Sequence, residues 1–259
     1  MKYTENTQHL DNRIRAHKLY SRATLESILA ESLAALGPGT SPILDLGCGN
    51  GNYFPLFSGT GRRYVGVDVN RELLESFTQK FTEEKLLIRA SMDELPEFMD
   101  GTFGAVYSVY SIYYTSQADT LIRQLHRVLQ HGGRLVVLGP GPGAHAPEIA
   151  ACLTQVSAAL RQKAPEAAVN KNTRLARLHS EILPAIAATF ATSDVREVDT
   201  SLVFPSTEEW TDYVLATPEA RERFPELSDA DLRQPVLGHA QASGCLTVSK
   251  SMVFVVAGR

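Results

Sequence analysis

The hydrophobic positions of this chain follow two alternating patterns. Apolar side chains recur every three or four residues in four stretches, which predicts helices over residues 25–36, 54–57, 73–81 and 121–129. Short, nearly continuous apolar runs predict strands over residues 43–46, 64–68, 86–89, 105–109 and 134–138. We expect Gly37-Pro38-Gly39 to end the first helix, Asn70 to cap the third, and Gly132-Gly133 to stop the fourth. Strands that alternate with helices in this way predict an α/β fold, a doubly wound and mostly parallel sheet with helices on both faces.

The second half of the chain departs from this alternation. Residues 144–192 are rich in alanine and helical in pattern, with interruptions at Pro165 and Pro184. Two late strands are expected over residues 195–204 and 246–256, separated by helical stretches near Trp210 and Leu232. About 49 residues are few for a self-sufficient core, so we interpret 144–192 as a helical lid insertion over the carboxyl edge of the sheet. The expected organisation is one domain, 1–259, with N-terminal helices (1–39), a core (40–143), the lid insertion (144–192) and C-terminal strands and helices that complete the sheet (193–259).

Composition and charge narrow the class of protein. The chain has 259 residues, 44% of them hydrophobic and 21% charged, which is typical of a globular protein. Its net charge of −4 is too mild to predict a polyanionic partner, and neither a signal peptide nor a membrane-spanning apolar run is evident. Cys48, Cys152 and Cys245 fit neither a disulfide framework nor a zinc site. We therefore expect a cytoplasmic protein without a nucleic-acid, membrane or metal partner.

A glycine-rich turn between the first strand and the next helix is the strongest chemical signal. Gly47, Gly49 and Gly51 would let a ligand approach the backbone, and Asp68 ends the next strand where a carboxylate reaches the hydroxyls of a ribose. Glycine also serves tight turns for steric reasons alone, so the motif by itself is weak. The third glycine comes one residue earlier than in the dinucleotide fingerprint, and the acidic Asp45 would repel a pyrophosphate. The turn favours a cationic nucleoside ligand.

Four segments in order resemble the class I S-adenosylmethionine-dependent methyltransferases, small-molecule type. They are the first motif at residues 43–53, the ribose acid in Val67-Asp68, the adenine segment at 90–96 and the connection into the fifth strand at 126–135. The resemblance covers about residues 40–140 and the terminal strand ending at Gly258. It implies a Rossmann-like sheet of seven strands whose last strand is antiparallel, with the core binding S-adenosylmethionine under the N-terminal helices, and S-adenosylhomocysteine as product.

The resemblance also implies which residues bind the cofactor. Asp45, Gly47 and Gly49 would meet the methionine moiety, Asp68 the ribose, and Ser91 and Met92 the adenine. Ser91 stands where relatives often have an acid; either Ser91 itself accepts the hydrogen bond from the adenine or Asp93 takes that role. Gly104 replaces a common Asp, which we expect to matter only structurally. The remaining expected contacts are Tyr20, Cys48, Val69, Ser108 and Val109. Tyr20 is equally suited to an ordinary packing role.

No obvious general base accompanies these positions. Tyr113, in the segment after the fourth strand, and His145, in the loop after the fifth, are the candidate catalytic residues, although either also suits packing or solvent exposure. The lid insertion has a surplus of two positive charges. Such a surplus usually marks a solvated helix face, but it also permits an acceptor that carries a carboxylate. Motifs of nucleic-acid, protein-arginine and metal-dependent catechol methyltransferases are not found in the sequence. We expect a small-molecule methyltransferase, monomeric or homodimeric. An inert cofactor-binding regulatory module is the main alternative, and a nicotinamide-dependent oxidoreductase a weaker one.

Overall fold

The computed structural model describes residues 7–142, 146–160 and 176–259. The chain divides into two compact units, which we call the helical unit and the sheet unit. The helical unit comprises Met1–Thr24, Gly141–Lys171 and Asp199–Ser251. The sheet unit comprises Leu25–Pro140, Asn172–Val198 and Met252–Arg259. Each unit is built from three separate stretches of chain, so residues 144–192, expected as one lid insertion, contribute to both.

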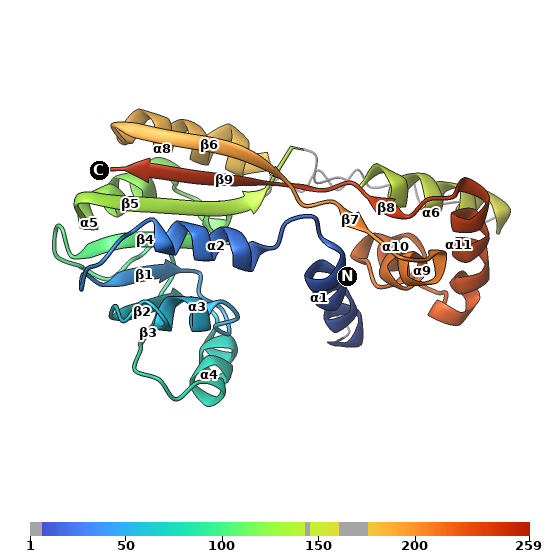
Figure 1. Cartoon of the computed structure of the whole chain (residues 1–259), viewed down its shortest axis with the longest axis horizontal. Coiled ribbons are helices and arrows are strands. Elements are labelled where there is room, and N and C mark those ends of the chain that lie inside the picture. Colours follow the sequence, from blue (N-terminus) through green and yellow to red (C-terminus); the bar gives the residue numbers. More distant parts are fainter. Residues whose placement is uncertain (1–6, 143–145, 161–175) are drawn as a thin grey trace. The chain divides into compact units, whose positions relative to one another are not determined.

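A seven-stranded sheet with strand order β3-β2-β1-β4-β5-β9-β6 forms the centre of the sheet unit (Figure 1). Its strands are β1 (Ile43–Leu46), β2 (Tyr64–Asp68), β3 (Leu86–Arg89), β4 (Phe103–Val109), β5 (Leu129–Pro140), β6 (Thr192–Asp199) and β9 (Ser251–Gly258). The pairs from β3 to β5 are parallel and β9 is antiparallel to β5. The helical elements of this unit are α2 (Leu25–Ala34), α3 (Phe54–Ser58), α4 (Arg71–Lys80), η1 (Ile112–Tyr114), α5 (Ala118–Val128), η2 (Leu178–Ile182) and α8 (Leu183–Thr189). The expected doubly wound α/β sheet with an antiparallel last strand is confirmed.

Both faces of the sheet are covered by helices. One core cluster joins apolar residues of α5, η2 and α8 to alternate strand positions such as Leu46, Val106 and Val137. On the opposite face, aromatic side chains of α3 and α4 pack on the strands, with Phe57 edge-on to Tyr107 at 5.0 Å. Because both faces are buried, the inner strands are largely apolar, which explains the nearly continuous runs in the sequence.

Strand register brings the ends of β1, β2, β3 and β4 to one edge of the sheet. Leu46 pairs with Val67 of β2, and Asp68 pairs with Arg89 of β3. The chain leaves β1 toward β2 and β3 but later returns to β4 on the other side of β1. Ligands of open α/β sheets bind beside such a change of direction, outside the carboxyl ends of the strands.

Some element boundaries differ from the sequence prediction. Gly132-Gly133 was expected to stop the fourth helix, but α5 already ends at Val128 and β5 starts at Leu129. Each expected late strand is split: residues 195–204 give β6 and β7 (Leu202–Val203), and residues 246–256 give β8 (Thr247–Val248) and β9. Asn70 does cap α4, and its side chain accepts hydrogen bonds from the backbone N–H groups of Glu72 and Leu73.

The helical unit packs its helices against the short β7-β8 ribbon. Its helices are α1 (Thr7–Tyr20), α6 (Pro147–Ala159), α9 (Thr207–Leu215), α10 (Pro218–Arg223) and α11 (Asp229–Ser243). Trp210, Tyr213, Phe224 and Leu232 lie in its core. Among the described helices of the chain, none is long and apolar enough to cross a membrane.

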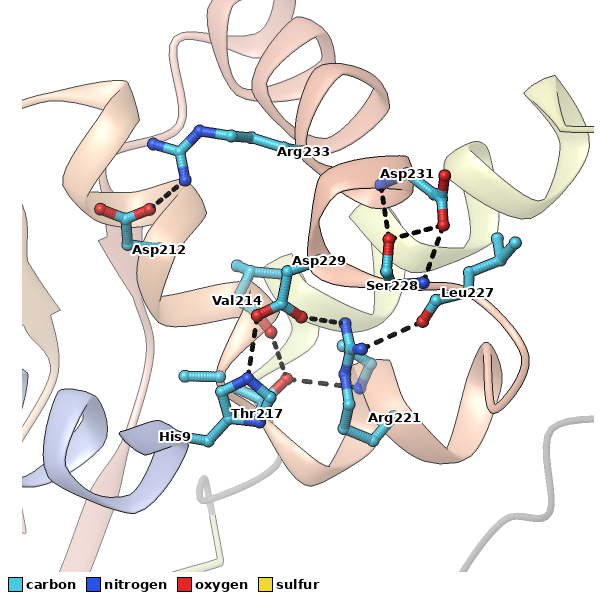
Figure 2. A network of polar contacts seen from close by, with 12 residues as sticks. His9, Asp212, Val214, Thr217, Arg221, Leu227, Ser228, Asp229, Asp231 and Arg233 are labelled. Atoms are coloured by element: carbon cyan, nitrogen blue, oxygen red, sulfur yellow. Dashed lines mark hydrogen bonds and ion pairs between the residues drawn. The ribbon is translucent and has the colours of Figure 1, made fainter. Parts of the chain in front are cut away.

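Polar and charged side chains of the helical unit form ion pairs and hydrogen bonds with one another (Figure 2). The carboxylate of Asp229 lies 2.9 Å from His9 Nε2 through one oxygen and 2.9 Å from Arg221 Nη2 through the other. Arg233 forms an ion pair of 2.5 Å with Asp212. These contacts link α1, α9, α10 and α11.

Candidate functional site

The turn after β1 is built around three glycines. Gly47, Gly49 and Gly51 have φ angles of 78°, 54° and 74°, a conformation that residues with a side chain seldom adopt. A Cβ at Gly47 would lie 2.3 Å from the Cβ of Ser111, and a Cβ at Gly51 would lie 2.5 Å from the ring of Phe77. The underside of the turn is therefore filled by neighbouring side chains, and glycine is required at both positions.

The first N–H groups of the turn are bonded to β2. The amides of Gly47 and Cys48 donate to the carbonyl oxygen of Val67 at 2.7 and 3.1 Å. The Cys48 thiol is buried, and burial, with the charges of Asp45 and Asp68, raises its pKa. Cys48 is therefore an uncharged, packed side chain of the turn.

Asp68 joins the glycine turn to the end of β2. Its Oδ2 accepts a hydrogen bond of 2.9 Å from the amide of Gly49, and its Oδ1 accepts one of 2.8 Å from the amide of Asn70. Each carboxylate oxygen can accept more than one hydrogen bond. Asp68 is thus fixed in position by the backbone and retains acceptor capacity for hydroxyl groups of a ligand.

Asp45 is a buried carboxylate that pairs with no described cation. Its side chain is 6% exposed, and its Oδ2 accepts a hydrogen bond of 2.6 Å from the hydroxyl of Tyr64. Burial raises the pKa of Asp45 to about 7; the Tyr64 hydrogen bond opposes this rise and the charge of Asp68 adds to it. A positive charge placed beside Asp45 would stabilise its ionised form.

Two serines lie beneath the glycine turn. Ser111 Oγ donates to the carbonyl oxygen of Leu46 at 2.5 Å, and the hydroxyls of Ser108 and Ser111 lie 2.5 Å apart. Ser108 is fully buried. Because Ser111 would touch any side chain at Gly47, the pair fixes the turn at the end of β1 from the β4 side.

The segment after β3 is hydrogen-bonded to the loop that precedes α5. Ser91 Oγ accepts from the amide of Asp93 at 3.2 Å. The Asp93 carboxylate accepts hydrogen bonds from the hydroxyl of Thr115 and from the amide and hydroxyl of Ser116. Partial burial raises the pKa of Asp93, but these hydrogen bonds outweigh it and hold the pKa below 3.8. Both Asp93 oxygens are thus engaged within the protein, whereas Ser91 and Met92 are half-buried.

Aromatic residues border the end of β4. Tyr110 has a φ of 54°, a strained conformation that is typical of functional sites. Burial raises the pKa of Tyr110 to about 12, and burial together with Glu26 and Tyr110 raises the pKa of Tyr53 to about 12. Tyr113 is 4% exposed and lies 5.1 Å from the ring of Tyr114, and its pKa is raised by burial and by both tyrosines. At neutral pH Tyr113 is therefore a neutral hydroxyl that packs in the core.

The structure places most of the expected site residues in the sheet unit. The residues that lie at the carboxyl edge, after or at the ends of β1 to β4, are Asp45, Gly47, Cys48, Gly49, Asp68, Val69, Ser91, Met92, Asp93, Ser108, Val109 and Tyr113. Val69 is 63% exposed. Tyr20 belongs to the helical unit, where its ring lies 5.1 Å from Phe204. His145 falls outside the described residues, so its role stays a prediction.

Sequence reasoning missed two residues that shape the site. Tyr64 holds Asp45, and the signal for it was available, because Tyr64 pairs with Ile43, two residues before Asp45 on the same face of β1. Ser111 lies in the segment after the fourth strand, close to Tyr113 in sequence, and was not predicted as a site residue. Its contact with Gly47 depends on the chain direction after β4, which no local pattern reveals.

Comparisons with known proteins agree with this geometry. Residues 44–137 match the protein family described as "Methyltransferase domain". The sterol 4-C-methyltransferase strm-1 of Caenorhabditis elegans is 29% identical over 99 residues, 36% of this chain and 29% of that protein. The ubiquinone/menaquinone biosynthesis C-methyltransferase UbiE of Vibrio parahaemolyticus is 31% identical over 130 residues, 47% of each chain. The chain thus spans less than half the length of both curated relatives.

A solved structure extends the likeness to the fold of nearly the whole chain. The YcgJ protein of Bacillus subtilis superimposes with a TM-score of 0.56 at 16% identity, covering 89% of this chain and 97% of that one. At this identity the likeness concerns the fold alone.

Proposed function

We propose that the protein is a class I S-adenosylmethionine-dependent methyltransferase that transfers a methyl group from S-adenosylmethionine to a small organic acceptor, because residues 44–137 match the family described as "Methyltransferase domain". The acceptor atom is nitrogen, oxygen or carbon, and S-adenosylhomocysteine is the product. The observation that carries the proposal is the arrangement of Asp68 and Asp45 beside the glycine turn. One carboxylate is fixed by the Gly49 amide at the end of β2, and the other is buried without a described cation.

The residues present fit this cofactor. Gly47 and Gly49 are only half-buried, so the backbone of the turn is partly accessible to a ligand. Asp68 has acceptor capacity for the two ribose hydroxyls. Asp45 lies beside the turn and would be neutralised by the ammonium group of the methionine moiety, directly or through the turn. The half-buried Ser91 and Met92 would border the adenine.

The bound cofactor supplies a methyl group on a positively charged sulfur, which leaves as a neutral thioether. The protein therefore has to align the two reactants, and alignment supplies about 7–11 kcal/mol in favourable cases. In this proposal, the carboxyl edge of the parallel strands and the hydrogen bonds from Thr115 and Ser116 to Asp93 hold the site in the geometry that alignment requires. Tyr110 and Tyr114, which are 37% and 57% exposed, offer aromatic surface on the β4 side, where an acceptor would lie.

The acceptor class that we propose is broader than the substrates in the names of the relatives. The two curated relatives are named as C-methyltransferases of a sterol and of ubiquinone and menaquinone biosynthesis. A planar or polycyclic acceptor would suit the tyrosines around the end of β4. We further propose a cytoplasmic protein, monomeric or homodimeric and without a nucleic-acid partner, because its three cysteines are unpaired and its net charge is mild.

Ligand-induced stabilisation tests the cofactor, and turnover tests the enzyme. We expect S-adenosylmethionine and S-adenosylhomocysteine, but not NAD, to raise the melting temperature, by an amount that grows with the logarithm of the ligand concentration above Kd. Transfer of a labelled methyl group to any of a panel of phenols, quinols, amines and sterols would establish the activity. Stabilisation without transfer to the panel would favour the inert cofactor-binding module, and stabilisation by NAD alone would favour the oxidoreductase.

A further inference from the structure

One histidine of the sheet unit lies in an unusual helical turn. Leu178–Ile182 form a π-helical segment, and α8 follows at once. Pro184 lies in the first turn of α8, where its missing N–H is tolerated. Single π-helical turns are rare and are found frequently at functional sites. His179 is the second residue of this segment.

The hydrogen bond of His179 determines where its proton lies. His179 Nε2 is 3.0 Å from the carbonyl oxygen of Pro140. A carbonyl oxygen can only accept, so Nε2 carries the hydrogen and donates it. In the neutral imidazole Nδ1 then has a free lone pair, and Nδ1 makes no hydrogen bond with a described residue. A backbone carbonyl thus orients this ring as a proton acceptor, the arrangement in which histidine acts as a general base.

His179 is held at the carboxyl edge of the sheet. Pro140 ends β5, and Leu138, two residues earlier, already pairs with Val109 at the end of β4. The adjacent Leu178 packs on Gly139, where a Cβ would lie 2.5 Å from its Cδ2 and 3.7 Å from the ring of Tyr113. The π-helical turn and the Tyr113 segment therefore meet at the end of β5.

The order of the expected cofactor contacts places the acceptor near this point. The adenine segment follows β3, the ribose carboxylate ends β2, and the glycine turn follows β1. This order runs along the edge of the sheet toward β4 and β5. An acceptor aligned with the sulfur from the far side would therefore lie over β4 and β5.

We propose that His179 is the general base of the methyl transfer. The inference rests on the proposed function. Nδ1 of His179 accepts the proton that the acceptor atom loses as that atom bonds to the methyl carbon. The carbon–sulfur bond breaks and its electron pair stays on sulfur, so the charge passes to the imidazolium. The Nε2 hydrogen bond to Pro140 stabilises that imidazolium and keeps the ring in place.

The tautomer provides a test that needs no turnover. In ¹⁵N-histidine NMR at pH 8, with the signal identified by its loss in His179→Gln, we expect a protonated Nε2 and an unprotonated Nδ1. His131→Gln, which removes an exposed histidine of β5, serves as the control for assignment. A protonated Nδ1 in the wild type would overturn the proposal.

Two probe acceptors test the chemical role. 1-Naphthol must lose a proton during methylation, whereas 1-naphthalenethiol is largely ionised at pH 8 and needs no base. We expect His179→Gln to lower kcat for 1-naphthol by about 10²–10⁴-fold, with the thiol rate and the S-adenosylhomocysteine affinity within a few-fold of the wild type. Added imidazole should restore part of the naphthol rate in His179→Ala.

The two proposals fail in different ways. Equal losses with both acceptors, or unchanged turnover of 1-naphthol by His179→Gln, would overturn the base and leave the methyltransferase proposal standing. A wild-type chain that neither binds S-adenosylhomocysteine nor methylates either probe would overturn both.

Discussion

The carboxylates of the two units have different kinds of partners. In the helical unit Asp229 is shared between His9 and Arg221, and Asp212 pairs with Arg233 (Figure 2). At the edge of the sheet unit the carboxylates of Asp45, Asp68 and Asp93 form no ion pair with a described residue. Their partners are backbone amides and hydroxyl groups.

We interpret this difference as one between carboxylates that stabilise the fold, such as Asp229, and carboxylates that we propose bind a ligand, such as Asp45 and Asp68. A buried carboxylate without a cation costs stability, and Asp45 carries this cost in its raised pKa. A purely structural acid would be expected to acquire a lysine or arginine, as Asp229 has. We propose that Asp45 and Asp68 instead bind a positively charged, hydroxyl-bearing molecule.

The largest effect is expected from filling the space under the glycine turn. Gly47→Ala adds a Cβ 2.3 Å from that of Ser111 at a φ of 78°. Overpacking and backbone strain together should cost about 3–5 kcal/mol of stability and abolish cofactor binding. Gly61→Ala, with φ of 69° but nothing within 4 Å, is the matched control and should cost about 1 kcal/mol. Equal losses in the two variants, measured by chemical denaturation, would show that the turn is not packed as described.

Removing the buried charge should stabilise the protein above neutral pH. An acid with a raised pKa loses stability as the pH rises from its unfolded pKa to its folded pKa, here from about 4 to about 7. Asp45→Asn should therefore raise the free energy of unfolding at pH 8 by as much as about 4 kcal/mol, and have little effect at pH 4. Circular dichroism is the suitable probe, because the single tryptophan, Trp210, reports on the helical unit.

Asp93 gives the opposite sign and serves as the control for Asp45. Its lowered pKa contributes stability that is present at neutral pH and is lost as the pH falls below 4. Asp93→Asn should therefore destabilise the chain at pH 8. A loss of stability in both variants at this pH would contradict the contrast between a strained and a satisfied carboxylate.

Asp68 should affect affinity more than stability. Asp68→Ala removes the acceptor for the Gly49 amide and for the ribose hydroxyls. We expect the affinity for S-adenosylhomocysteine to fall by about 1.5–3 kcal/mol, the range for hydrogen bonds to a charged group. Asp68→Asn, which keeps one carbonyl oxygen, should lose less. An unchanged Kd for Asp68→Ala in calorimetry would remove Asp68 from the site.

The smallest effect is expected from removing Asp229, the shared carboxylate of the helical unit. Asp229→Ala leaves Arg221 and His9 without their shared acceptor and should lower stability by about 1–2 kcal/mol. Because this network is structural, the Kd for S-adenosylhomocysteine should stay within twofold of the wild type. A large loss of affinity at unchanged stability would place this network in the functional site.

Much of the sheet unit could be predicted from local patterns. Continuous apolar runs identified its inner strands, because both faces of the sheet are buried, and the glycine spacing identified the turn beside Asp68. The split of each late strand was not predicted, because only two polar residues separate β6 from β7 (Thr200 and Ser201) and β8 from β9 (Ser249 and Lys250). The division of the chain into two units depends on long-range packing that periodicity does not report.

The site was predicted less completely than the fold. Motif positions located Asp45, Gly47 and Asp68, which depend on chain-local geometry. Ser111 and His179, the latter placed in the site by our proposal, contact residues 65 and 39 positions away. Such contacts follow from the path of the chain after β4 and β5, and a single sequence does not encode them in any short pattern.

Proton release on cofactor binding tests the central claim most directly. Because burial raises the pKa of Asp45 to about 7, we expect its carboxyl group to be partly protonated near neutral pH in the free protein, and a cation beside Asp45 would ionise it. Titration of S-adenosylmethionine at pH 7 in buffers of different ionisation enthalpy should show release of a fraction of one proton, which is lost in Asp45→Asn. A binding enthalpy that is independent of the buffer in the wild type, or proton release that persists in Asp45→Asn, would contradict the account.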